Sequence, residues 1–128
     1  MKEPMSARVL VVDDDEPLLR AHARALTRNG YQVETATDGD AAMRALQQAS
    51  FNVILSDIDM PGMNGIQLLE RARTYDLDVP VVLITGNPSV ETAIKAMEHG
   101  ALRYLVKPVA LDSLAKVVGD AARLHRIA

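Results

Sequence analysis

Apolar residues in this chain occur in two alternating patterns. Short runs that are wholly or mostly apolar, such as residues 9–12 and 51–56, are typical of strands buried on both faces of a parallel sheet. Between these runs, apolar residues recur every three or four positions, which is typical of helices with one buried face. The alternation predicts strands at about 8–13, 33–36, 51–57, 79–84 and 102–106, and helices at about 16–29, 39–49, 66–72, 90–97 and 111–124.

Residues with strong positional preferences mark the expected helix ends. An aspartate precedes the first helix, Pro17 lies in its first turn, and Gly30 follows it. Asp38 has the corresponding capping position before the second helix. These residues support the same boundaries as the apolar pattern.

The regular alternation predicts an α/β fold. Five strand–helix units in 128 residues favour an open, doubly wound parallel sheet, because a barrel of eight units needs about twice that length. We expect a flavodoxin-like (βα)5 fold with strand order 2-1-3-4-5. No linker or repeat interrupts the units, so we expect one domain over residues 8–126 after an N-terminal tail of residues 1–7.

Polar side chains follow four of the five expected strands. They are Asp13, Asp14 and Asp15 after the first strand, Asp57 at the end of the third, Thr85 after the fourth and Lys107 after the fifth. In the expected strand order the first and third strands are neighbours, so Asp13, Asp14 and Asp57 converge at the carboxyl edge, where open α/β sheets bind ligands. Crowded carboxylates repel one another unless a cation offsets their charge. The sequence therefore predicts a Mg²⁺ held by Asp14 and Asp57, with Asp13 acting through water.

The same edge carries the groups that phosphoryl transfer needs. Asp57 is a candidate nucleophile, because a carboxylate can attack phosphorus and form an aspartyl phosphate. The oxygens of an anionic phosphoryl group need positive charge beside them, which Lys107 would supply together with Mg²⁺. Thr85 can donate its hydroxyl to a phosphoryl oxygen, and Gly86 would allow a close backbone approach.

Composition excludes several other classes of function. The chain has no cysteine, which removes disulfides, thiolate metal sites and cysteine nucleophiles and fits a cytoplasmic protein. It has no apolar stretch of the roughly 20 residues that span a membrane, and residues 1–7 lack the apolar core of a signal peptide. A net charge of −3 and only four aromatic residues argue against a nucleic-acid surface in this domain.

Four segments in order resemble the receiver domain of two-component response regulators, in the CheY-like superfamily. They are residues 11–14 (VVDD), 57–65 (DIDMPGMNG), 82–86 (VLITG) and 100–108 (GALRYLVKP). The resemblance implies that Asp57 accepts a phosphoryl group from a phosphohistidine on a sensor histidine kinase or a histidine phosphotransfer protein. It also implies Asp13 and Asp14 at the Mg²⁺ site, with the backbone carbonyl of Asp59 as a further ligand.

The resemblance also implies a switch rather than an enzyme that turns over a separate substrate. Thr85 matches the hydroxyl residue that moves toward the phosphoryl group, and Tyr104 matches the aromatic residue that turns inward after it. Lys107 and Pro108 match a pair whose peptide bond is usually cis. The readout surface would be the fourth helix, fifth strand and fifth helix; whether a homodimer forms through this face stays open.

Two residues affect what can be carried over from the family. Asp59 lies two positions after the acceptor, and Asn87 lies two positions after Thr85. Both flank the path of an attacking water, so we expect them to modulate the lifetime of the phosphorylated state. That lifetime is not inherited from the family.

Other interpretations remain beside the switch. Asp57-Ile58-Asp59 resembles the DxD nucleophile motif of haloacid dehalogenase-type phosphatases, but those enzymes place their second acidic pair after a late strand. A phosphorylation-independent interaction module with a vestigial site is the other alternative. Helix capping alone could explain the three consecutive aspartates, and Tyr104 could be edge packing. The three histidines have no metal-ligand spacing and receive no role.

Overall fold

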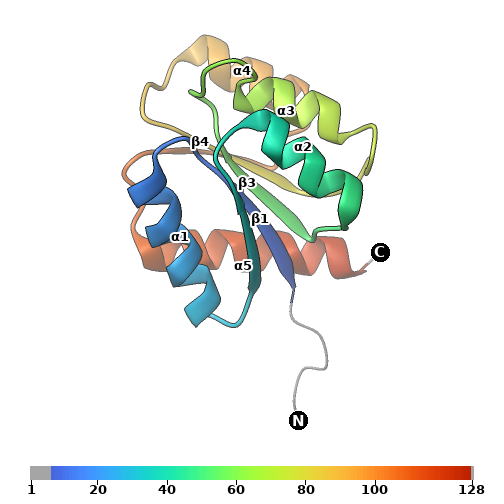
Figure 1. Ribbon diagram of the computed structural model, residues 1–128. Coiled ribbons are helices and arrows are strands. Elements are labelled where there is room, and N and C mark those ends of the chain that lie inside the picture. Colours follow the sequence, from blue (N-terminus) through green and yellow to red (C-terminus); the bar gives the residue numbers. More distant parts are fainter. Residues whose placement is uncertain (1–6, 128) are drawn as a thin grey trace.

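The computed structural model describes residues 7–127, in which five parallel strands alternate with five helices (Figure 1). The strands are Arg8–Val12 (β1), Gln32–Ala36 (β2), Val53–Asp57 (β3), Val81–Thr85 (β4) and Arg103–Val106 (β5). The helices are Glu16–Arg28 (α1), Gly39–Gln48 (α2), Gly65–Ala72 (α3), Val90–Glu98 (α4) and Leu111–Ile127 (α5). Within these residues no helix combines the length and the apolar character that crossing a bilayer requires.

The sheet has the predicted topology. Its strand order is β2-β1-β3-β4-β5 and all pairs are parallel, which confirms the doubly wound fold. Two strands begin two residues later than predicted: β3 at Val53 and β4 at Val81. At β4 the reason is Pro80, whose carbonyl accepts from the Ile54 amide while its nitrogen has no hydrogen to donate to the ladder.

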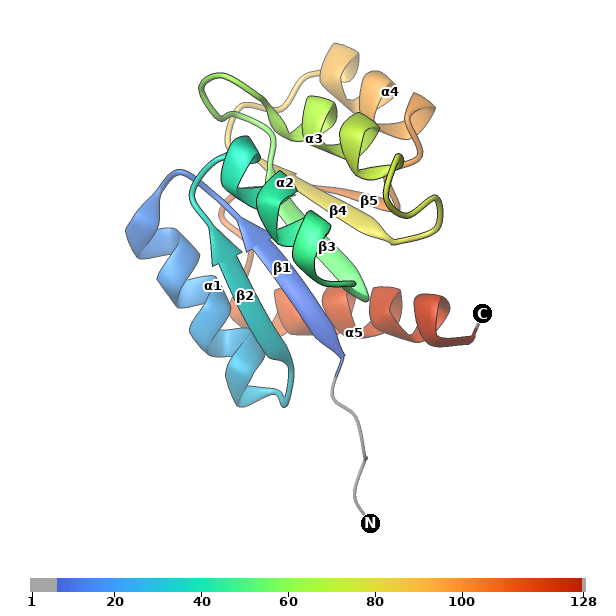
Figure 2. The same ribbon diagram turned by 45° about the vertical axis from the view of Figure 1, so that its right-hand side comes forward.

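Helices cover both faces of the sheet. The views in Figures 1 and 2 agree that α1 and α5 lie on one face and that α2, α3 and α4 lie on the other. Each face has its own apolar core, and the residues of β1, β3 and β4 are almost all buried between them. This double burial explains why the central strands appear in the sequence as continuous apolar runs.

Helix α4 has fewer buried residues than any of the other four helices. Ala96 is its only buried residue among those described, while the side chains of Val90, Ile94 and Met97 are exposed. Apolar burial is the main contribution that fixes a helix to its sheet. We therefore expect α4 to move more easily than the other four helices.

The first turn of α3 packs directly against the end of β3. Asn64 and Gln67 form a capping box at this helix start. A Cβ at Gly65 would collide with the backbone carbonyl of Asp57, so only glycine allows the helix to begin this close to the strand. The sequence predicted a helix from about residue 66, directly after this glycine, but not the contact of the glycine with residue 57.

Candidate functional site

Strand register brings the predicted site residues together at the carboxyl edge of the sheet. Val12 pairs with Ser56, so Asp13 and Asp57 follow on adjacent strands. Thr85 pairs with Val106, and the residue after Val106 is Lys107, whose amide donates to the Thr85 carbonyl at 2.8 Å. The carboxyl ends of four adjacent strands, β1, β3, β4 and β5, thus place the acidic, hydroxyl and basic groups at one site.

Lys107 lies between two buried carboxylates. Its Nζ is 3.2 Å from Asp13 Oδ2 and 3.4 Å from Asp57 Oδ1, and the side chains of both aspartates are at most 4% exposed. The Lys107–Pro108 peptide bond is cis. One ammonium thus faces two carboxylates that have almost no access to solvent.

Burial and crowding change the acid–base behaviour of this group. Burial, reinforced by the negative charge of Asp13, raises the pKa of Asp57 to about 6. Burial alone would lower the pKa of Lys107, but the carboxylates of Asp13 and Asp57 more than offset it and the pKa is raised. Lys107 therefore stays charged at neutral pH, while Asp57 pays a desolvation penalty when it ionises.

The acidic groups fit a divalent, oxygen-binding cation. Carboxylate oxygens of Asp13, Asp14 and Asp57 all lie within 4.8 Å of one another. Ionised, the three groups leave two negative charges in excess of the Lys107 ammonium, and carboxylate oxygens are the ligands that Mg²⁺ prefers. The contribution of the Asp59 carbonyl to this site stays a prediction.

Asp15, the third consecutive aspartate, caps helix α1 and does not belong to the group formed by Asp13, Asp14 and Asp57. Its side chain accepts from the amide of Leu18 and caps α1, and its own amide donates to Asp13 Oδ1 at 2.9 Å. The capping interpretation is therefore correct for this residue. Its amide also helps to orient the Asp13 carboxylate toward the site.

The Thr85 hydroxyl is buried and takes part in two hydrogen bonds. Its hydroxyl donates to Asp59 Oδ2 at 2.5 Å and accepts from the amide of Asn87 at 2.9 Å. The Asp59 amide in turn donates to Asp57 Oδ1 at 3.3 Å. Sequence reasoning placed all four residues near the site but missed the bond between Asp59 and Thr85. The only available signal was that both residues follow neighbouring strands.

Tyr104 connects β5 to the start of α4. Its hydroxyl lies 2.8 Å from Thr92 Oγ1 and accepts from the Ser89 amide at 3.2 Å, and Ser89 caps α4. Its ring is half-buried and packs against the core beneath α2, α3 and α4.

Gly86, which follows Thr85, was expected to allow a close backbone approach. A Cβ at Gly86 would meet Lys107 Cδ at 3.7 Å, which is an ordinary van der Waals contact. The role of Gly86 toward a phosphoryl group therefore stays a prediction.

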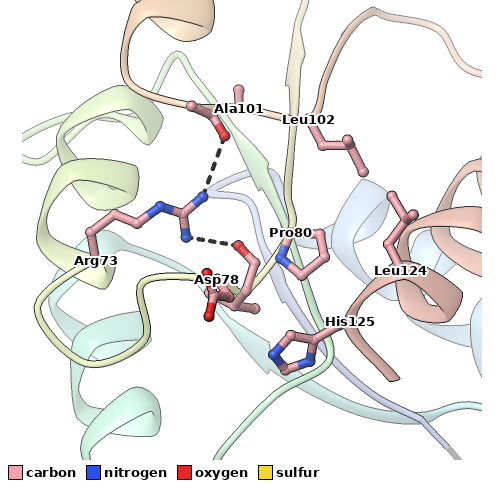
Figure 3. Close-up of a pocket in the computed structure, with 9 residues that line it drawn as sticks. Arg73, Asp78, Pro80, Ala101, Leu102, Leu124 and His125 are labelled. Atoms are coloured by element: carbon pink, nitrogen blue, oxygen red, sulfur yellow. Dashed lines mark hydrogen bonds between the residues drawn. The ribbon is translucent and has the colours of Figure 1, made fainter. Parts of the chain in front are cut away.

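A hollow of about 500 Å³ lies away from this site (Figure 3). Its lining includes Pro80 and Leu102, which precede β4 and β5, so it opens at the amino edge of the sheet. Both terminal nitrogens of Arg73 donate to backbone carbonyls there, those of Val79 at 2.7 Å and Gly100 at 3.3 Å. These bonds give Arg73 a structural role that joins α3 to the starts of two strands.

Comparisons with known proteins agree with this geometry. The family described as "Response regulator receiver domain" matches residues 9–119. The crystal structure of a CheY-like response regulator receiver domain protein from Methanospirillum hungatei JF-1 superimposes with a TM-score of 0.92 at 29% identity, covering 96% of this chain and 98% of that one. The chemotaxis protein CheY4 from Vibrio cholerae gives a TM-score of 0.87 at 34% identity, covering 91% of this chain and 99% of that one.

Curated relatives are longer than this chain. The transcriptional regulatory protein PrrA from Mycobacterium tuberculosis is 40% identical over 109 residues, which cover 85% of this chain and 47% of PrrA. The two-component response regulator ARR14 from Arabidopsis thaliana is 36% identical over 116 residues, which cover 89% of this chain and 30% of ARR14. The chain thus spans less than half the length of these relatives. It belongs to the response regulator receiver domain family.

Proposed function

We propose that Asp57 accepts a phosphoryl group from a phosphohistidine on a sensor histidine kinase or a histidine phosphotransfer protein. The observation that carries this proposal is the pairing of buried Asp57 with Lys107 at 3.4 Å, next to two further carboxylates that fit a divalent cation. A phosphoryl transfer site needs a nucleophile together with positive charge for the transferred group. This edge of the sheet supplies both.

In the transfer, a carboxylate oxygen of Asp57 forms a bond to phosphorus as the bond from phosphorus to the donor imidazole nitrogen breaks. The imidazole leaves with the electron pair and takes up a proton. Lys107 binds a phosphoryl oxygen and offsets its charge, and Thr85 can donate its hydroxyl to another. When bound at Asp13, Asp14 and Asp57, Mg²⁺ supplies further positive charge to the phosphoryl oxygens.

The phosphorylated protein then acts as a switch. Movement of Thr85 toward the phosphoryl group changes the β4–α4 connection, and inward rotation of Tyr104 releases its contacts with the start of α4. These changes alter the surface formed by α4, β5 and α5, whose exposed apolar side chains suit a target protein or a second copy of the chain. They are Val90, Ile94, Met97, Val106 and Leu111. The longer relatives suggest that an attached output domain is one such target.

The lifetime of the phosphorylated state depends on the side chains that lie next to Asp57. Asp59 and Asn87 both contact Thr85 and are exposed to solvent. A water that attacks the aspartyl phosphate must pass these side chains. We propose that both residues modulate the rate of dephosphorylation.

The test is the intact mass of the protein after incubation with acetyl phosphate, with Mg²⁺ and with EDTA. We expect the wild type to gain one phosphoryl group only with Mg²⁺, and the Asp57→Asn variant to gain none. Folding of the variant is checked by circular dichroism. No gain by a folded wild type, together with no binding of fluoroberyllate, would favour an interaction module with a vestigial site.

A parallel assay with a chromogenic phosphate ester separates the switch from a haloacid dehalogenase-like phosphatase. The structure places the acidic pair Asp13 and Asp14 after β1, whereas those phosphatases place it after a late strand. We therefore expect no multiple turnover of the ester. Steady release of the chromophore would contradict the proposal.

A further inference from the structure

The Thr85 hydroxyl can donate one hydrogen bond, and in this structure it donates that bond to the Asp59 carboxylate. Thr85 is 1% exposed, and its Oγ1 lies 2.5 Å from Asp59 Oδ2. The other contact of the hydroxyl is as an acceptor from the Asn87 amide at 2.9 Å. A hydroxyl donates one hydrogen bond at a time. While Thr85 donates to Asp59, it is not available as a donor to a group on Asp57.

We propose that the Asp59 carboxylate is a positioning residue that holds the Thr85 hydroxyl in the unphosphorylated protein and competes for it with the phosphoryl group on Asp57. This inference rests on the proposed function and concerns the regulation of the same site. Asp59 does not touch the transferred group in this role. It acts through Thr85, from the connection between β3 and α3.

The charges around the site favour an exchange of partners. A hydrogen bond from a hydroxyl to a carboxylate is charge-assisted and stronger than one between neutral groups. A phosphoryl group on Asp57 brings further negative charge close to Asp59, whose amide already contacts Asp57 Oδ1 at 3.3 Å. The phosphoryl group and the Asp59 carboxylate repel each other, and each has anionic oxygens that can accept the hydrogen bond from the Thr85 hydroxyl. Phosphorylation therefore both weakens the old bond and provides the new one.

The same hydroxyl connects the acceptor site to α4. The Asn87 amide donates to Thr85, and two residues later Ser89 caps α4 and contacts the Tyr104 hydroxyl. Because α4 buries only Ala96, small changes at its start meet little resistance. The bond between Asp59 and Thr85 thus also stabilises the unphosphorylated position of the β4–α4 connection.

The experiment is a double-mutant cycle on fluoroberyllate binding in the presence of Mg²⁺, measured by isothermal titration calorimetry. The four proteins are the wild type, Asp59→Ala, Thr85→Val and the double variant. Thr85→Val removes the hydroxyl while keeping the shape of the side chain. Circular dichroism and thermal unfolding confirm that each variant is folded.

We expect Asp59→Ala to tighten fluoroberyllate binding by about ten- to a hundredfold when Thr85 is present, which corresponds to the loss of one competing hydrogen bond to a charged group. In the Thr85→Val background the same substitution should have no such effect. Asp59→Asn, which keeps an acceptor oxygen without the charge, should tighten binding less than Asp59→Ala.

Two results would overturn the inference. Equal tightening in both backgrounds would mean that Asp59 acts only by its charge through space. No tightening in either background, with normal binding by the wild type, would mean that Asp59 does not hold Thr85. Failure of the wild type itself to bind fluoroberyllate or to accept a phosphoryl group would instead refute the proposed function, and this inference with it.

Discussion

Replacing Asp57 by asparagine should stabilise the metal-free protein at pH 8. The Asp57 side chain is almost completely buried, and burial together with Asp13 raises its pKa from 3.8 to about 6. The folded protein therefore holds the proton more tightly than the unfolded chain does. Stability from this group is full below the unfolded pKa near 4 and is lost as the pH rises through the folded pKa near 6.

The magnitude follows from the shift. A rise of about two pKa units corresponds to about 3 kcal/mol at a pH well above both values. Asparagine resembles the protonated acid in shape and charge, so it avoids this penalty. We expect Asp57→Asn to raise the free energy of unfolding by up to about 3 kcal/mol at pH 8, or about 10 °C in Tm, and to leave it nearly unchanged at pH 4.

The assay is urea unfolding of both proteins in EDTA from pH 4 to pH 8, followed by circular dichroism. The difference between the two proteins at each pH isolates residue 57 from other titrating groups. Asp78→Asn is the matched control, because Asp78 is exposed and its replacement should change stability by at most a few tenths of a kcal/mol. A difference that does not grow between pH 4 and pH 8, or a less stable variant at pH 8, would refute this reasoning.

Three further changes test other parts of the site. Lys107→Met should lower stability by about 3 kcal/mol at pH 8, since it leaves two buried carboxylates without their ammonium, and should abolish phosphorylation in the mass assay. Gly65→Ala should cost about 2 kcal/mol in urea unfolding, because its Cβ collides with the Asp57 carbonyl. Mg²⁺ at ten times its Kd should stabilise the wild type by about 1.4 kcal/mol, and the thermal shift should shrink in Asp14→Asn. Unchanged stability in either of the first two variants, or an equal Mg²⁺ shift in Asp14→Asn, would contradict the site geometry.

The fold was predictable because its central strands are buried on both faces. Such strands appear in the sequence as continuous apolar runs, and helices with one buried face appear between them. The position of the site followed from the same pattern, since the carboxyl ends of parallel strands meet at one edge. The sequence pattern is therefore enough to place Asp13, Asp57 and Lys107 at the same edge.

Other features depend on contacts that periodicity does not encode. The late start of β4 depends on Pro80, which cannot donate to the neighbouring strand. The close approach of α3 to the acceptor depends on the missing Cβ of Gly65. The bond between Asp59 and Thr85 depends on the paths of two irregular loops. Local backbone geometry and side-chain direction decide these contacts, and neither follows a repeating pattern.

The most direct test of the central claim is to identify the residue that carries the phosphoryl group. After phosphorylation by acetyl phosphate with Mg²⁺, borohydride reduction converts an aspartyl phosphate to homoserine, which tandem mass spectrometry of peptides can locate. We predict homoserine at position 57, and none when Mg²⁺ is replaced by EDTA. Homoserine at Asp13, Asp14 or Asp59, or unmodified Asp57 in a folded protein, would contradict the account.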